Sequence, residues 1–277
     1  MTESGWLEVG PGVFHRRYDP MDVSVVVIVG PGGLTVVDTR NNPAEADEVI
    51  RDVALRFDRP IVAVVNTHAH YDHSFGNQSF AALPGVVLYG HHLIRRHYTE
   101  YEEPRLAAVQ ADPSVEPDKR WADVVLTPPG SLIQTRCSVA PGGRTLELIP
   151  LERGHTDTDL VVFIPDCRVW LLGDIVEESG PPMFGSGSFP LAWPGVLAGL
   201  LRGIEPGDVV VPGHGAVVDR AFVVRQQEAL QRVADTIRSS HAAGTSLDDL
   251  AADHEVFTLW PRVMLESAFR QGGAQLH

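Results

Sequence analysis

The sequence predicts an α/β fold organised as one domain. Short runs of apolar, β-branched residues alternate along the chain with segments of helical periodicity, and glycine- or proline-rich turns separate them. The chain has 277 residues, of which 44% are hydrophobic, so it can bury a core large enough for a rigid enzyme. We find no short-period repeat and no linker-like segment in it. A single domain over residues 1–277 is therefore expected.

The first half of the chain begins with a predicted β-hairpin. Residues 23–29 form a nearly uninterrupted run of valine and isoleucine, and residues 34–38 form a second apolar run after a turn of proline and glycine. Ile61 to Asn66 is a third run, mostly β-branched and without polar alternation. This composition is typical of a strand that is covered on both faces.

A helix is predicted between the second and third of these strands. Asn42 is suited to the N-cap, Pro43 to the first helical position, and Glu45 places a negative charge in the first turn. Helical spacing then continues, so the helix is expected to end at about Arg56.

The second half of the chain repeats this alternation. Residues 145–149, 160–164, 169–172 and 209–211 are predicted strands, and the middle two are expected to pair and to end at Gly173-Asp174. Each strand leads directly into a turn that carries polar side chains.

A polar insertion and a helical tail complete the predicted organisation. Residues 98–121 are rich in Glu, Pro and Asp, which predicts a surface helix and loop that is either a lid or a solvated excursion. Helical spacing over residues 219–240, 247–250 and 256–269 predicts a C-terminal helical region at about 219–271.

Composition excludes several classes of partner. The formal charge of -14 would repel nucleic acid, and no cluster of basic residues offsets it. Cys137 and Cys167 lack a CxxC spacing and are expected to be reduced, partly buried thiols. Neither a targeting segment nor a run long enough to span a bilayer is evident, so we expect a cytoplasmic protein with a small-molecule substrate and no membrane partner. The sequence leaves open whether it forms a homo-oligomer.

Seven side chains with metal-binding chemistry follow the predicted strands. They form one run after the third strand and three later, glycine-flanked positions: His68, His70, Asp72 and His73, then His155, Asp174 and His214. A lone His-x-His is usually structural, but the whole set in this order is typical of a metal site. The remaining histidines lack such context and are expected on the surface or in packing.

The types of ligand indicate which ions could bind. Imidazole and carboxylate without thiolate suit zinc, and also iron or manganese. His68 and His70 can bind one ion, while Asp72 and His73 turn toward a second. We therefore expect two divalent metal ions, with Zn²⁺ as the first choice and iron or manganese as alternatives.

The run His68-Ala69-His70-Tyr71-Asp72-His73, with the turns at His155, Asp174 and His214, resembles the metallo-β-lactamase-fold hydrolases. The resemblance implies a four-layer αββα sandwich with the metals at one edge of the two sheets. It also implies that His68, His70 and His155 bind the first metal, that Asp72, His73 and His214 bind the second, and that Asp174 bridges them.

The resemblance further implies a dinuclear hydrolase in which a bridging hydroxide attacks a carbonyl carbon. Asp72 is the candidate catalytic residue, because it can orient the nucleophile and pass a proton to the leaving group. The alternative is a mononuclear iron oxidoreductase of the persulfide dioxygenase type, in which the second-metal residues persist without an ion. A metal-binding protein that has lost catalysis is a third reading, which the intact ligand set disfavours.

The substrate class stays open among thioesters, lactones, esters and β-lactam amides. The segment Gly154 to Val162 resembles the branch that holds glyoxalase-II-like and class B3-like proteins. The tail offers arginines but no lysine, so glutathione is not supported as part of the substrate.

Three features around the predicted site allow two readings each. Asp38 resembles the aspartate of the family's Asp-Thr-Gly element and could orient a metal ligand, or it could only bond the turn, because Arg40 stands where the glycine is expected. Residues 176–193 could wall an apolar substrate pocket or pack on the C-terminal helices. Tyr71 could donate a hydrogen bond to substrate or fill space beside the metals.

Overall fold

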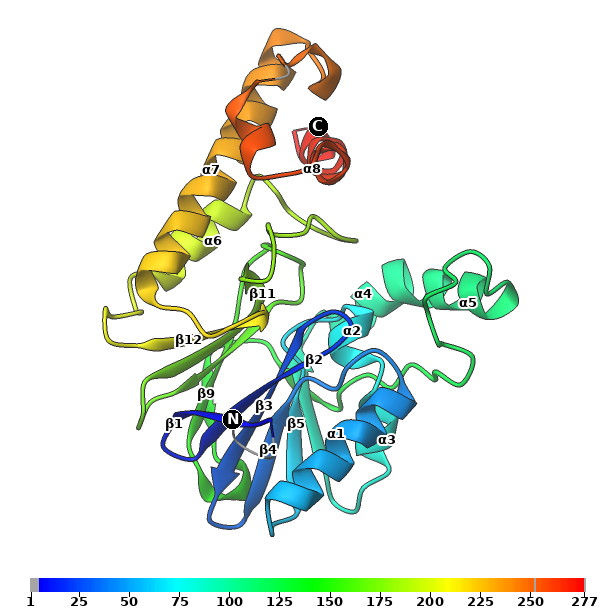
Figure 1. Cartoon of the computed structure of the whole chain (residues 1–277), viewed down its shortest axis with the longest axis vertical. Coiled ribbons are helices and arrows are strands. Elements are labelled where there is room, and N and C mark those ends of the chain that lie inside the picture. The colour runs from blue at the N-terminus through cyan, green and yellow to red at the C-terminus, as the bar shows by residue number, and fades with distance from the viewer. Residues whose placement is uncertain (1–4, 252, 277) are drawn as a thin grey trace.

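The computed structural model describes residues 5–251 and 253–276, and Figure 1 shows them as a layered α/β molecule. The strands are β1 (Leu7–Gly10), β2 (Val13–Tyr18), β3 (Val23–Gly30), β4 (Gly33–Val37), β5 (Ile61–Val65), β6 (Val87–His91), β7 (Ser131–Ile133), β8 (Cys137–Val139), β9 (Leu146–Pro150), β10 (Leu160–Ile164), β11 (Val169–Glu177) and β12 (Val209–His214). The helices are α1 (Pro43–Arg56), α2 (Tyr71–Ser74), α3 (Asn77–Ala81), α4 (Ile94–His97), α5 (Glu103–Ala111), α6 (Trp193–Leu200), α7 (Arg220–Ala243) and α8 (Arg262–Ala274), with short turns η1 (Tyr98–Glu102), η2 (Pro141–Gly143), η3 (Leu247–Asp249) and η4 (Glu255–Thr258).

The strands form two sheets that are joined at one point. β1 to β7 make the N-terminal sheet and β8 to β12 the C-terminal sheet, and the only register pair between them in the described residues is His214 with Val23. Within the N-terminal sheet β4, β5, β6 and β7 are parallel neighbours. In the C-terminal sheet β11 and β12 are parallel, so the ends that carry Asp174 and His214 lie together.

Three hydrophobic cores show that these sheets are stacked in four layers. Side chains alternate along each strand, so Val25 and Val27 of β3 pack under α1 whereas Val26 and Ile28 face the other sheet. On the other side, Val161 of β10 packs under α6 and α7 while its neighbours point between the sheets. One core lies between the sheets and one under the helices on each outer face, which confirms the predicted αββα sandwich.

The local predictions for the first half are confirmed. β3 and β4 form an antiparallel hairpin, and β5 follows as a buried parallel strand. Helix α1 begins at Pro43, where the Asn42 side chain accepts the backbone N–H of Glu45 at 3.0 Å, and it ends at Arg56. Both cysteines are free thiols of intermediate burial, as expected.

Some predicted boundaries were wrong. β11 runs on to Glu177 and β12 runs through His214, so Asp174 and His214 lie inside strands rather than in turns after them. Residues 256–269 do not form one helix, because Pro261 separates η4 from α8. Strands β1 and β2 and helix α6 had not been expected.

The insertion at residues 98–121 combines η1, α5 and a loop. It is less solvated than its composition predicts, because Tyr98, Glu102 and Trp121 are buried within it. None of the helices in residues 5–251 and 253–276 is both long and apolar enough to cross a bilayer.

Arg40 takes over a backbone position that normally needs glycine. Its φ is +67°, in the left-handed region, and its guanidinium is buried against the Tyr18 ring at 4.4 Å. It also donates to the backbone oxygen of Asp19 and pairs with Glu45 and Glu48. The turn geometry expected of glycine is thus present, and side-chain contacts compensate for the strained backbone.

We predict that Arg40→Gly and Arg40→Ala both destabilise the fold, and that the alanine variant is the less stable one by about 1 kcal/mol. Both lose the buried guanidinium contacts, but only alanine retains a Cβ at φ +67°. Urea unfolding followed by circular dichroism measures both free energies of unfolding. An alanine variant as stable as the glycine variant would contradict the strained-turn interpretation.

Candidate metal centre

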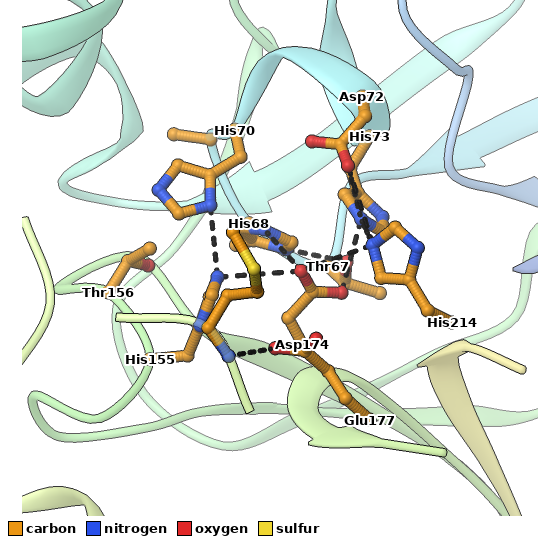
Figure 2. A network of polar contacts seen from close by, with 12 residues as sticks. Thr67, His68, His70, Asp72, His73, His155, Thr156, Asp174, Glu177 and His214 are labelled. Carbon is orange, nitrogen blue, oxygen red and sulfur yellow. Dashed lines mark hydrogen bonds and ion pairs between the residues drawn. The ribbon is translucent and has the colours of Figure 1, made fainter. Parts of the chain in front are cut away.

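The seven predicted residues meet at one edge of the sandwich (Figure 2). His68 and His70 lie in the loop after β5, Asp72 and His73 in the short helix α2, and His155 in the turn before β10. Asp174 and His214 come from the adjacent strands β11 and β12. All seven are buried, with at most 8% of their surface exposed.

The first group consists of His68, His70, His155 and Asp174. Their candidate ligand atoms all lie within 4.8 Å of one another. His155 Nε2 and His70 Nδ1 are 2.9 Å apart, and Asp174 Oδ2 lies 3.5 Å from His155 Nε2 and 3.7 Å from His68 Nε2. This spacing leaves room for one small cation between the four side chains.

The second group consists of Asp72, His73 and His214. Nε2 of His73 and Nε2 of His214 are 3.2 Å apart, and Asp72 Oδ2 is 3.4 Å from His214 Nε2. Asp174 also reaches this group, with Oδ1 at 3.1 Å from His73 Nε2. The carboxylate of Asp174 therefore approaches imidazole nitrogens of both groups.

Glycine at position 213 is what allows Asp174 to sit there. A Cβ at Gly213 would lie 1.8 Å from Asp174 Oδ1 and 2.8 Å from the Asp174 backbone nitrogen, so any other residue would displace the carboxylate or the β11 backbone. The Gly213-His214 pair thus brings β12 against the carboxylate while presenting the imidazole beside it.

The donor set fits cations in both groups. In four of the histidines one ring nitrogen bonds to a protein group and the other points into the centre: His68 Nδ1 to Thr67 Oγ1, His70 Nε2 to the Ser186 carbonyl, His73 Nδ1 to Asp38, and His214 Nδ1 to the Met21 carbonyl. His68 Nε2 and Asp174 Oδ1 are buried without a hydrogen-bond partner. Inward lone pairs of this kind suit metal ions.

Electrostatics distinguish the two groups. Burial, together with neighbouring imidazoles, lowers the pKa of His70 to about 3, and burial lowers that of His155 to about 4, so their lone pairs are free at neutral pH. In the second group burial acts in the same direction, but the carboxylates of Asp174 and Asp72 outweigh it and raise the pKa values of His73 and His214. A cation bound there replaces protons.

Asp38 orients candidate metal ligands, which was the first of the two interpretations of this residue. Its Oδ2 accepts from His73 Nδ1 at 2.8 Å and from the Thr67 hydroxyl at 2.7 Å, and its Oδ1 accepts the Thr67 backbone N–H at 2.8 Å. Since Thr67 Oγ1 also contacts His68 Nδ1, one carboxylate orients a histidine of each group.

The residues that contact the His70 ring on the side away from the other candidate ligands were not predicted from the sequence. Ser186 accepts from His70 through its carbonyl and donates its hydroxyl to the buried Glu102. His97, expected to be a surface or packing residue, lies with its ring centroid 5.7 Å from that of His70 and bonds Asp157. These residues come from α4, the insertion, the segment between β9 and β10 and the loop after β11, and no local pattern links them to the ligand run.

The comparisons with known proteins agree with this geometry. A model of the metallo-beta-lactamase superfamily matches residues 18–218, which is more than half of the chain. The chain belongs to the metallo-β-lactamase superfamily. It is 23% identical over 233 residues to a "Metallo-beta-lactamase type 2" of Bacillus sp. (strain 170), covering 83% of this chain and 80% of that protein.

Solved structures of two other proteins share the fold. A metallo-beta-lactamase from Pontibacter korlensis superposes with a TM-score of 0.64 at 20% identity, over 82% of this chain and 98% of that one. The sec-alkylsulfatase Pisa1 from Pseudomonas sp. superposes with a TM-score of 0.76 at 18% identity, over 96% of this chain and half of that one. Membership of this superfamily, with the buried His/Asp clusters, supports a metal-dependent hydrolase.

The support that Asp38 gives to His73 has a testable consequence. We predict that Asp38→Asn lowers zinc affinity roughly 10- to 100-fold, because an amide can no longer accept strongly from His73 Nδ1. Chelator competition measures the affinity of each site. Asp52→Asn is the control, since Asp52 bonds Tyr18 and Arg16 and none of the candidate ligands. Unchanged affinity in Asp38→Asn would show that this carboxylate only stabilises the turn.

Proposed function

We propose that this chain is a dinuclear metal-dependent hydrolase that acts on a small molecule with a carbonyl group: a thioester, lactone, ester or β-lactam-like amide. The observation that carries the proposal is the position of Asp174, whose two oxygens lie within 3.1–3.7 Å of imidazole nitrogens from both groups. A carboxylate placed in this way suits two ions held side by side.

In this proposal His68, His70 and His155 hold the first ion, Asp72, His73 and His214 hold the second, and Asp174 contacts both. When bound, two divalent ions, most simply Zn²⁺, supply a hydroxide at neutral pH and polarise the carbonyl that it attacks. The protein contributes fixed ligand directions and a site from which most water is excluded.

Asp72 is the candidate group for transferring a proton from the nucleophile to the leaving group. Burial alone would raise the pKa of Asp72, but the charge on His73 and the hydrogen bond from His214 outweigh it and lower the pKa to about 2. The carboxylate is therefore ionised at neutral pH, and it lines the cavity over the site. There it can orient the nucleophile and carry its proton to the leaving group.

The alternative of a mononuclear iron oxidoreductase of the persulfide dioxygenase type uses only the first group. The second group favours hydrolysis, because Asp72, His73 and His214 are buried and converge, with His73 and His214 each fixed by a protein acceptor. The buried carboxylates of Asp72 and Asp174 need positive charge beside them, and a second cation would supply it in place of protons on His73 and His214.

We predict that Asp72→Asn lowers kcat/KM at least 100-fold for every ester, lactone and thioester that the zinc-loaded protein hydrolyses, because the amide cannot accept a proton. A substrate panel assayed by pH-stat measures this, and metal analysis of the same sample shows whether zinc stays bound. Asp235→Asn is the control, because Asp235 is 59% exposed on α7. Full activity of Asp72→Asn with zinc retained would make the assigned role of Asp72 wrong.

A further inference from the structure

A cavity of about 480 Å³ lies over the candidate metal ligands, within the usual size range of small-molecule sites. Its floor contains His70, Asp72, His155, Asp174 and His214. Its outer wall contains every methionine among the described residues: Met21, Met183 and Met264. These three come from the β2–β3 turn, the loop after β11, and helix α8.

The charged side chains of the wall are already engaged within the protein. Apart from the candidate ligands, the charged residues that line this cavity in the described chain are Arg105 and Glu177. Arg105 makes two hydrogen bonds of 2.6 Å to Glu116, and Glu177 accepts the backbone N–H of Met183 at 2.9 Å. Both charged side chains therefore already have partners within the protein.

The backbone of this wall is fixed although its side chains are flexible. The Gln271 side chain of α8 donates to the carbonyls of Phe184 and Gly185 and accepts the Ser188 N–H. The loop after β11 therefore packs on the C-terminal helices and also lines the cavity. The two interpretations of residues 176–193, a pocket wall and a loop packed on these helices, thus hold together. Met183 still has 53% of its surface exposed, so an apolar side chain faces solvent at the cavity mouth.

Met21, Met183 and Met264 together are called the methionine wall. We propose that the methionine wall binds a flexible, unbranched apolar chain of an otherwise neutral substrate, beside the bond that is hydrolysed. The proposal rests on the proposed hydrolase function and names its substrate class. Methionine suits this task, because its unbranched, polarisable side chain adapts to a flexible apolar ligand. When a ligand covers an exposed apolar side chain at the mouth of a site, apolar surface is removed from water and the complex is stabilised.

The test compares 4-nitrophenyl esters of increasing acyl length on the zinc-loaded full chain. We expect kcat/KM to rise about two- to fourfold for each methylene added to acetate until the cavity is filled. We also expect kcat/KM to be lower for a succinate half-ester, which ends in a carboxylate, than for the neutral esters. Equal rates for acetate and octanoate esters, or a preference for the succinate half-ester, would overturn the methionine-wall proposal and leave the hydrolase function standing.

Met264 allows a matched pair of substitutions. Met264→Leu and Met264→Gln are of similar size, but only glutamine is polar. The octanoate-to-acetate ratio of kcat/KM should stay within twofold of wild type in Met264→Leu and fall roughly fivefold or more in Met264→Gln. Val263→Gln controls for the added amide, since Val263 is 70% exposed one position earlier in α8. Equal ratios in the leucine and glutamine variants would contradict the proposal.

A second readout does not depend on catalysis. Octanamide should protect Met183 and Met264 from peroxide oxidation in the zinc-loaded protein, whereas acetamide should not, as measured by mass spectrometry of the peptides. Protection without ester hydrolysis would support the apolar site while refuting carbonyl ester hydrolysis. Hydrolysis without chain-length-dependent protection would overturn the apolar site alone.

Discussion

The buried carboxylate of Asp174 lies between two groups of imidazoles, and most of the surrounding structure serves to hold it there. It is fixed by β11, it fits against β12 because residue 213 is glycine, and its oxygens approach four histidines from three segments of the chain. Two ionised carboxylates in so small a buried volume need positive charge beside them, which bound cations would supply in place of protons on His73 and His214. The arrangement is therefore better explained by metal binding than by packing.

The sandwich provides the rigidity that such a site requires. The two sheets pack against each other through the core between them, and the loops that carry the candidate ligands are hydrogen-bonded to one another. The Ala69 N–H donates to Thr158 Oγ1, and the Leu160 N–H donates to the Thr67 carbonyl, so the His68 loop is hydrogen-bonded to the segment that follows His155. Asp38 hydrogen-bonds His73 directly and His68 through Thr67, which leaves Nε2 of both rings facing the centre of the site.

The sequence predicted those features that local patterns encode. The cap at Asn42, the hairpin at residues 23–38 and the position of the run 68–73 directly after β5 depend on neighbouring residues, so the structure confirms them. The ends of β11 and β12 were wrong because backbone pairing between these two strands continues past the apolar runs. Ser186 and Gln271 could not be predicted, since their roles depend on contacts between segments more than 80 positions apart.

The number and kind of metal ions bound to the active chain test the central claim most directly. Native mass spectrometry of the protein purified with its own metal, combined with elemental analysis and oxygen-electrode measurements, gives both. The two-group site predicts two divalent ions per chain, hydrolysis of a carbonyl substrate and no oxygen consumption. One iron per chain, with oxygen uptake when a persulfide is added, would contradict the dinuclear hydrolase and establish the oxidoreductase instead.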